Sequence, residues 1–333
     1  MYNLETRRAA DEINRRGASR VLIQLPDGLR PQALTLAQEL GELTDAEILI
    51  SGDSCYGACD LATRQAEDLE ADLLVHYGHS AMMAETSIPV VYIEAGVDYD
   101  PETLLEKALP LTEGWERIGL AATVQHVHRL WETAQALERH GKTPLLGRGT
   151  SRTPHDGQIL GCDYATALTI ADGVDGFIFI GAGRFHPLGL AAATSKPVVT
   201  ADPYTSTARK LGEREVMRLA MRRMAAITAA KEAERIGVIV STKPGQLQLS
   251  IARSIRDRLQ KKGKKAAIIC LDEVTSLKLG NFTEAQAFIN TACPRIAVDG
   301  LPDTAQPIIT TVEAEIMLEE KRWEEVWGRT YFG

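Results

Sequence analysis

Residues 20–42, RVLIQLPDGLRPQALTLAQELGE, place a short apolar run before a turn and a helical pattern. The same plan returns at residues 117–142, RIGLAATVQHVHRLWETAQALERHGK, and at residues 235–264, RIGVIVSTKPGQLQLSIARSIRDRLQKKGK. Self-similarity of this kind indicates repeated structural units. The sequence therefore predicts three copies of one strand-and-helix plan.

Each copy continues with three further apolar runs. The second runs lie at 46–51, 143–147 and 265–271, the third at 72–80, 176–187 and 285–297, and the fourth at 89–95, 197–203 and 307–313. Short apolar runs that alternate with helical patterns are typical of parallel sheets covered by helices on both faces. We expect an α/β protein of three pseudo-repeated small domains, 1–112, 113–231 and 232–333, each a four-stranded parallel sheet flanked by helices.

Composition narrows the functional class. Apolar residues make up 44% and charged residues 25% of the chain, which is typical of a globular protein. The formal net charge of −8 argues against a nucleic-acid partner, and no apolar stretch is long enough for a membrane span. The first residues, MYNLETRRAADEINRRG, predict an amphipathic helix rather than an export signal, so we expect a cytoplasmic protein.

Three of the five cysteines lie in loops that contain glycine or proline, one in each copy of the plan: Cys59, Cys162 and Cys293. An odd cysteine count without an export signal favours reduced thiols. In open α/β sheets ligands bind beyond the carboxyl ends of the strands, so loops that follow strands can converge on a central site. Three thiolates suit a [4Fe–4S] cluster with one iron left open, and we predict these cysteines as its ligands.

The other two cysteines are not expected to bind the cluster, and zinc is the alternative metal for the three predicted ligands. Any single cysteine is more often a small buried apolar residue than a ligand. Cys55 stands four residues before Cys59, but a fourth thiolate would close the cluster, so we expect no ligand role for Cys55. Cys270 lies within an apolar strand and is expected in the core. Zinc competes with iron, although three thiolates from three domains would be unusual for it.

Glycine-bearing loops at 25–31, 76–80, 180–187 and 241–246 also accompany predicted strands. Their backbone N–H groups suit carboxylate or ribose oxygens, yet none matches a nucleotide-binding fingerprint, and each can be an ordinary turn. Arginine suits a carboxylate and histidine can line a channel, although each can instead pair with an acidic neighbour. The candidate cofactor-binding residues are Asp27, Gly28, His79, Gly181, Gly183, Arg184, His186, Gln246 and Arg295.

The C-terminal segment EAEIMLEEKRWEEVWGRTYFG predicts an amphipathic helix, with Trp323 and Trp327 four residues apart on one face. That face either packs within the chain, which is favoured, or contributes to a dimer.

The motifs LPDGL, GDSCYGACD, LVHYGHS, GQILGC, IGAGRFHPLGLA, DPY, TKPGQ and NTACPRIAVD run from Leu25 to Asp299. In this order they resemble those of the archaeal diphthamide synthase family, iron–sulfur enzymes that use S-adenosylmethionine in the first step of diphthamide biosynthesis. The resemblance implies a homodimer in which Cys59, Cys162 and Cys293 of each subunit hold a [4Fe–4S] cluster. The chain lacks the C-x3-C-x2-C motif of the common radical S-adenosylmethionine enzymes.

The resemblance also implies the reaction. The reduced cluster, supplied by an electron donor, cleaves the bond between sulfur and the methionine γ-carbon by radical chemistry. The 3-amino-3-carboxypropyl group then joins imidazole C2 of a histidine in translation elongation factor 2, and methylthioadenosine is released. Two other functions stay open, a quinolinate-synthase-like [4Fe–4S] dehydratase and a non-catalytic iron–sulfur partner protein.

Overall fold

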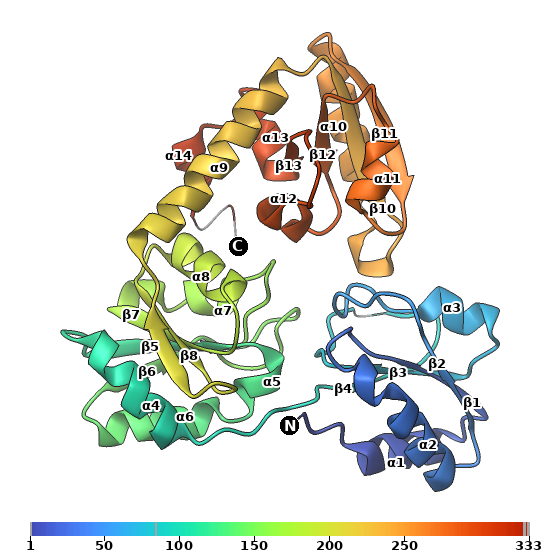
Figure 1. The fold of residues 1–333 in the computed structure, drawn as a ribbon, viewed down its shortest axis with the longest axis vertical. Helices are drawn as coiled ribbons and strands as arrows, with labels where there is room; N and C mark the ends of the chain where they lie inside the picture. The colour runs from blue at the N-terminus through green and yellow to red at the C-terminus, as the bar shows by residue number, and fades with distance from the viewer. Residues whose placement is uncertain (1, 84, 329–330, 332–333) are drawn as a thin grey trace. The chain divides into compact units, whose positions relative to one another are not determined.

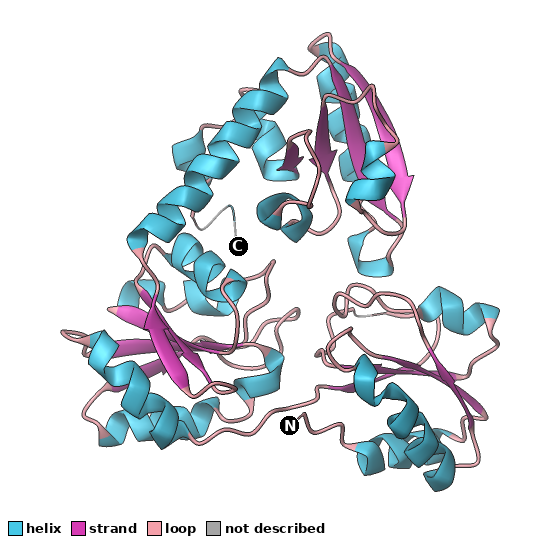
Figure 2. Ribbon diagram, in the orientation of Figure 1, coloured by secondary structure: helices cyan, strands magenta, loops and turns pink. Residues whose placement is uncertain are grey.

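The computed structural model describes residues 2–83, 85–328 and 331, and it contains three mostly parallel sheets (Figures 1 and 2). The first has the order β2 (Glu47–Ile50), β1 (Arg20–Gln24), β3 (Leu73–Tyr77), β4 (Val90–Ile93). The second is β6 (Thr143–Leu146), β5 (Arg117–Ala122), β7 (Gly176–Ile180), β8 (Val198–Asp202), β9 (Thr207–Lys210). The third is β11 (Lys265–Leu271), β10 (Arg235–Ser241), β12 (Ala287–Asn290), β13 (Ile308–Thr310). The common order confirms the predicted repeat, and β9 is an unpredicted addition at one edge.

Helices follow the strands in each copy. Around the first two sheets they are α1 (Thr6–Arg16), α2 (Ala33–Leu43), α3 (Thr63–Asp68), α4 (Pro101–Ala108), α5 (Val124–Val127), α6 (Leu130–Arg139) and α7 (Ala165–Leu168). The remaining helices are α8 (Phe185–Thr194), α9 (Glu213–Glu232), α10 (Leu249–Lys261), α11 (Ser276–Gly280), α12 (Arg295–Asp299), α13 (Thr311–Met317) and α14 (Trp323–Val326). Short 3₁₀ turns lie at Arg30–Gln32, Leu109–Thr112, Ala171–Gly173 and Pro244–Gln246. No helix of the described residues is both long and apolar enough to cross a membrane.

The strands are apolar without alternation because both of their faces are covered. In β1, Val21 and Ile23 pack into a core with α1 and α2, while Leu22 packs on the opposite face with Leu61 and Leu74. The third sheet repeats this arrangement, since Val238 and Ile239 enter separate apolar clusters. Neighbouring residues of a strand point to opposite faces, so a strand covered on both sides needs an unbroken apolar run.

The structure divides into two compact units. One comprises the chain through Leu160 together with Ala165–Gly183 and Val199–Arg209, and the other comprises Gly161–Tyr164, Arg184–Val198 and the chain from Lys210 onward. Cys59 therefore lies in the first unit, whereas Cys162 and Cys293 both lie in the second. The three domain ranges stay a prediction, although the three sheets that suggested them are present.

Two local expectations need correction. Cys270 is exposed rather than buried, because β11 is an edge strand whose residues are only partly covered. The C-terminal segment forms two short helices, α13 and α14, instead of one continuous helix. Trp323 and Trp327 do share a face, since their rings stack with centroids 4.6 Å apart, and Trp323 packs against the core of the second unit. Four residues of this segment, 329–330 and 332–333, lie outside the described part of the chain.

Candidate functional site

The loop that carries Cys59 lies between β2 and α3, and a side chain of β1 holds it by hydrogen bonds to its backbone. Gln24, at the end of β1, is buried, and its Nε2 donates to the Asp60 carbonyl at 2.7 Å. The same side chain accepts from the Ala62 amide through Oε1 at 3.1 Å. A Cβ on Gly57 would lie 3.5 Å from the Cys59 sulfur, so this half-buried thiol packs over a bare stretch of backbone. The loop therefore has a defined conformation around its sulfur.

Two further loops meet this one at the carboxyl end of the first sheet. Asp27 and Gly28 are exposed in the turn after β1, and Asp27 forms an ion pair of 3.2 Å with Arg30. Arg30 also donates to the Asp53 carbonyl in the cysteine loop. Gly78, after β3, has φ +82° and sits so close to Pro26 that an added Cβ would lie 2.9 Å from the proline ring. The loops after β1, β2 and β3 thus form one edge, as expected for parallel strands.

Cys162 and Cys293 belong to loops of the second unit that pack against each other. Gly161 has no room for a side chain, because a Cβ there would collide with the Phe185 ring and lie 3.0 Å from Arg295 Cδ. The Arg295 guanidinium lies 3.9 Å from the centre of the Phe185 ring and pairs with Asp299 at 2.9 Å. The neighbour of Cys162 therefore touches a residue two positions after Cys293. Both thiols are half-buried.

The second of these loops is also anchored through its backbone. Asn290 Nδ2, at the end of β12, donates to the Cys293 carbonyl at 2.7 Å, and the same carbonyl accepts from the Ile296 amide at 3.1 Å. His186 is half-buried at the start of α8, and burial, with the Arg295 cation as a smaller cause, lowers its pKa to about 4. His186 is thus neutral at pH 7 beside a permanent positive charge.

The other predicted site residues differ in their exposure and in their contacts. Gly181 and Gly183 have φ +151° and +80° in the turn between β7 and α8, conformations that favour glycine. Arg184 is exposed and pairs with Glu215 of α9. Gln246 is buried at the carboxyl end of β10, beside the buried Lys243, whose carbonyl accepts from the Gln246 amide at 2.9 Å. Their predicted contacts with S-adenosylmethionine stay predictions.

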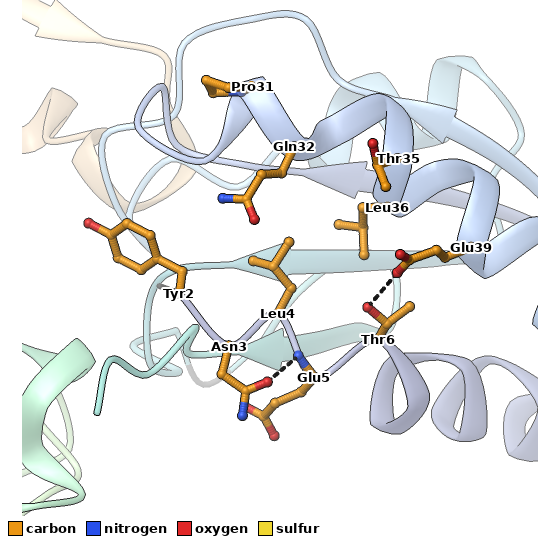
Figure 3. A pocket seen from close by; sticks show the side chains of 10 residues that line it. All are labelled: Tyr2, Asn3, Leu4, Glu5, Thr6, Pro31, Gln32, Thr35, Leu36 and Glu39. Carbon is orange, nitrogen blue, oxygen red and sulfur yellow. Dashed lines mark hydrogen bonds between the residues drawn. The ribbon is translucent and has the colours of Figure 1, made fainter. Parts of the chain in front are cut away.

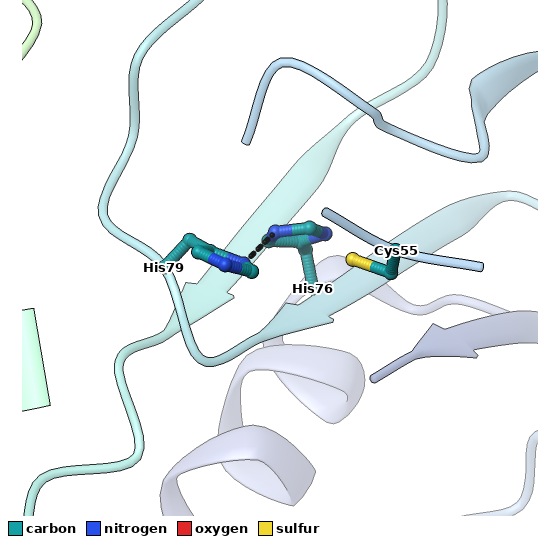
Figure 4. Close-up of side chains that lie close together, drawn as sticks. All are labelled: Cys55, His76 and His79. Carbon is teal, nitrogen blue, oxygen red and sulfur yellow. Dashed lines mark hydrogen bonds between the residues drawn. The ribbon is translucent and has the colours of Figure 1, made fainter. Parts of the chain in front are cut away.

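One group at the first sheet was missed from the sequence. The ligand atoms of Cys55, His76 and His79 all lie within 4.8 Å of one another (Figure 4). His76 Nε2 is 3.0 Å from His79 Nδ1, and His76 Nδ1 is 2.8 Å from Gln24 Oε1. Burial lowers the pKa of His76, with His79 as the smaller cause, and burial lowers the pKa of His79 to about 4. The available signal was a cysteine followed by an H-x2-H spacing at a strand end.

A surface hollow of about 340 Å³ lies elsewhere in the first unit, between the N-terminal segment and α2 (Figure 3). Thr6 Oγ1 donates to Glu39 Oε2 across it at 3.1 Å. None of the predicted site residues lines it, and its lining contains neither cysteine nor histidine. It therefore offers no soft metal ligand.

Comparison with known proteins gives one consistent answer. Residues 25–328 match the family model described as putative diphthamide synthesis protein. The chain is 39% identical over 321 residues to the 2-(3-amino-3-carboxypropyl)histidine synthase of Pyrococcus horikoshii, covering 95% of this chain and 92% of that one. It is 29% identical to subunit 1 of the human synthase, with 99% and 75% covered. The crystal structure of Pyrococcus horikoshii Dph2 with a 4Fe-4S cluster aligns with TM-score 0.88 and 37% identity, covering 96% and 92%. The chain therefore belongs to the diphthamide synthesis protein family and is an enzyme, a transferase of the 3-amino-3-carboxypropyl group.

Proposed function

We propose that this chain carries out the first step of diphthamide biosynthesis. It transfers the 3-amino-3-carboxypropyl group of S-adenosylmethionine to imidazole C2 of a histidine in elongation factor 2 and releases methylthioadenosine. The observation that carries the proposal is the similarity, along nearly the whole chain, to a synthase named for this product and to a Dph2 structure that contains a 4Fe-4S cluster. An elongation-factor substrate implies action in the cytoplasm.

The donor set fits an iron–sulfur cluster. Cys59, Cys162 and Cys293 are half-buried in loops that follow strands, and two of those loops pack against each other. Half-burial suits a ligand that must be reached by iron and yet shielded from water. A reduced cluster, when bound, supplies the electron for C–S cleavage and an open iron for the sulfonium donor. We propose these three thiolates as its ligands in each subunit of a homodimer that is fed by an electron donor.

The surrounding residues position the donor. We propose that Arg295, whose guanidinium is oriented by the Phe185 ring and by Asp299, attracts the carboxylate of the methionine moiety. The neutral His186 borders the same loops without adding a second charge. We propose Asp27, Gly28, Gly181, Gly183, Arg184 and Gln246 as the other donor contacts. His79, which the sequence also placed in this set, lies instead against the His76 ring. A positioned donor converts a bimolecular encounter into a reaction within one complex.

The test is a product assay. Protein reconstituted under anaerobic conditions with iron and sulfide, then reduced, should form methylthioadenosine from S-adenosylmethionine and label elongation factor 2. Cys59→Ala, Cys162→Ala and Cys293→Ala should each lose iron or turnover, whereas the matched Cys270→Ala should retain both. Full iron occupancy and turnover in all three variants would refute the ligand assignment. An intact sulfonium with fully loaded wild-type protein would instead favour a dehydratase or a non-catalytic partner.

A further inference from the structure

The group formed by Cys55, His76 and the half-buried His79 connects the loop after β2 to the end of β3. Cys55 lies in the loop after β2, His76 is the last residue but one of β3, and His79 follows the turn at Gly78. The left-handed φ of Gly78, +82°, reverses the chain so that the His79 ring returns to the His76 ring, with centroids 5.1 Å apart. Figure 4 shows the Cys55 sulfur directed toward the same two rings. We propose that these three side chains hold one divalent transition-metal ion, Zn²⁺ in the first instance.

The distances suit a single coordination sphere. Tetrahedral zinc binds nitrogen at about 2.0–2.1 Å and sulfur at about 2.3 Å, which places two ligating nitrogens about 3.3 Å apart. His76 Nε2 and His79 Nδ1 are 3.0 Å apart, so an opening of a few tenths of an ångström admits the ion. One ring nitrogen of each histidine and the Cys55 sulfur all lie within 4.8 Å of one another. A sulfur and a nitrogen on one tetrahedral zinc lie about 3.6 Å apart, so the sulfur has to approach by at most about 1.2 Å.

The protonation states also suit a metal. A neutral imidazole carries its proton on one ring nitrogen and offers the lone pair of the other to a metal. Gln24 Oε1 is an acceptor 2.8 Å from His76 Nδ1 and therefore holds the proton there, leaving Nε2 to face His79. Metal-binding histidines are commonly oriented by such an acceptor on the other ring nitrogen. One thiolate and two imidazoles favour zinc over calcium or magnesium, which prefer oxygen ligands.

An ion at this position would hold the cysteine loop from a second side. Gln24 contacts both the His76 ring and the carbonyl of Asp60, the residue that follows Cys59. The ion would join Cys55, in the same loop, to the end of β3. Binding to the folded chain alone stabilises that fold. The site is distinct from the predicted cluster because it uses Cys55 and leaves Cys59 for iron, and it assigns His79 to the ion instead of to S-adenosylmethionine. It does not depend on the transfer reaction.

Zinc and iron should follow different cysteines. Wild-type protein reconstituted with its iron–sulfur cluster, then incubated with Zn²⁺ and dialysed, should retain about one zinc per chain by elemental analysis. Cys55→Ser and His79→Ala should lower that content at least about tenfold, whereas Cys59→Ser and the exposed Cys270→Ser should keep it. Less than about a tenth of an equivalent in the wild type, or unchanged zinc in Cys55→Ser, would overturn the proposal. Loss of zinc in Cys59→Ser with retention in Cys55→Ser would also overturn it.

A spectroscopic measurement guards against variants that fail to fold. Co²⁺ added to the wild type should give the visible bands of a tetrahedral ion together with a thiolate-to-cobalt charge-transfer band. The bands should persist in Cys59→Ser and disappear in Cys55→Ser, while circular dichroism shows that both variants are folded. Octahedral cobalt without thiolate bands in the wild type would refute the site. Failure of methylthioadenosine formation would leave these metal contents unchanged, so the two proposals can fail separately.

Discussion

A buried ion pair in the second unit connects α9 and α13 to the helix that carries Arg295. Arg223 of α9 donates through Nε to Glu313 Oε1 at 2.8 Å and through Nη2 to Glu313 Oε2 at 2.6 Å. It also donates to the Ala297 carbonyl in α12 and, at 2.8 Å, to the Ile308 carbonyl. The two side chains are only 4% and 0% exposed. Any change to this pair should therefore act on both stability and the position of α12.

Glu313→Gln removes the negative charge and leaves the Arg223 guanidinium buried beside a neutral amide. Breaking one side of a buried pair costs about 3–5 kcal/mol, because the remaining charge stays desolvated. Glu313 also accepts from the Thr310 amide at 2.7 Å and from the Tyr331 hydroxyl at 2.8 Å. The amide of glutamine can keep some of these bonds, so the lower end of that range, about 3 kcal/mol, is expected.

Urea unfolding followed by circular dichroism and tryptophan fluorescence measures this loss. The matched control is Glu320→Gln, which removes a carboxylate paired with Arg258 but leaves both partners partly exposed, and it should change the unfolding free energy by about 0–1 kcal/mol. The double variant Arg223→Met with Glu313→Leu should recover most of the loss, since it leaves no unpaired buried charge. The reasoning would be refuted if Glu313→Gln lowered the unfolding free energy by less than about 1 kcal/mol. It would also be refuted if the loss in the double variant equalled the sum of the losses of its two single substitutions.

Three further predictions follow from single contacts. Gly161→Ala should displace the Phe185 ring packed against it and lower the iron retained after anaerobic reconstitution. Gly280→Ala is the control, because Gly280 has open space around it and its substitution should leave iron retention unchanged. Equal iron retention in the two variants would contradict the packing argument. His155 lies 2.6 Å from Glu94, whose hydrogen bond raises the pKa of His155. The stability contributed by the His155–Glu94 pair is full below about pH 6.5 and is lost as the pH rises through the raised pKa of His155. Glu94→Gln should therefore remove that part of the pH dependence of thermal unfolding. An unchanged pH profile would contradict the assigned role of the pair. Cys270→Ser should change the unfolding free energy by no more than about 0.5 kcal/mol in urea titrations, because the thiol is exposed, and a loss above 1 kcal/mol would restore its predicted core role.

The sequence by itself determined the repeated sheets. The runs that begin at Arg20, Arg117 and Arg235 became β1, β5 and β10, each second in its sheet and flanked on both sides by other strands. A strand buried on both faces must be apolar at every position, so its signal survives in a single sequence. Edge strands lack that constraint. The polar strand β9 was therefore missed, and the apolar run around Cys270 was taken for core.

The candidate sites also differ in whether the sequence or the tertiary structure reveals them. Loops that contain glycine or proline pointed to Cys59, Cys162 and Cys293 as candidate ligands, because these residues mark turns in the local sequence around each cysteine. Cys55 lies in the same glycine-bearing loop, but its approach to His76 and His79 leaves only an H-x2-H spacing about twenty residues further along the chain. That approach depends on which strands are neighbours and on how far each extends before its loop turns back, and both are decided by packing among residues remote in the chain. Only the tertiary structure brings a thiol and two imidazoles from separate loops within one coordination distance.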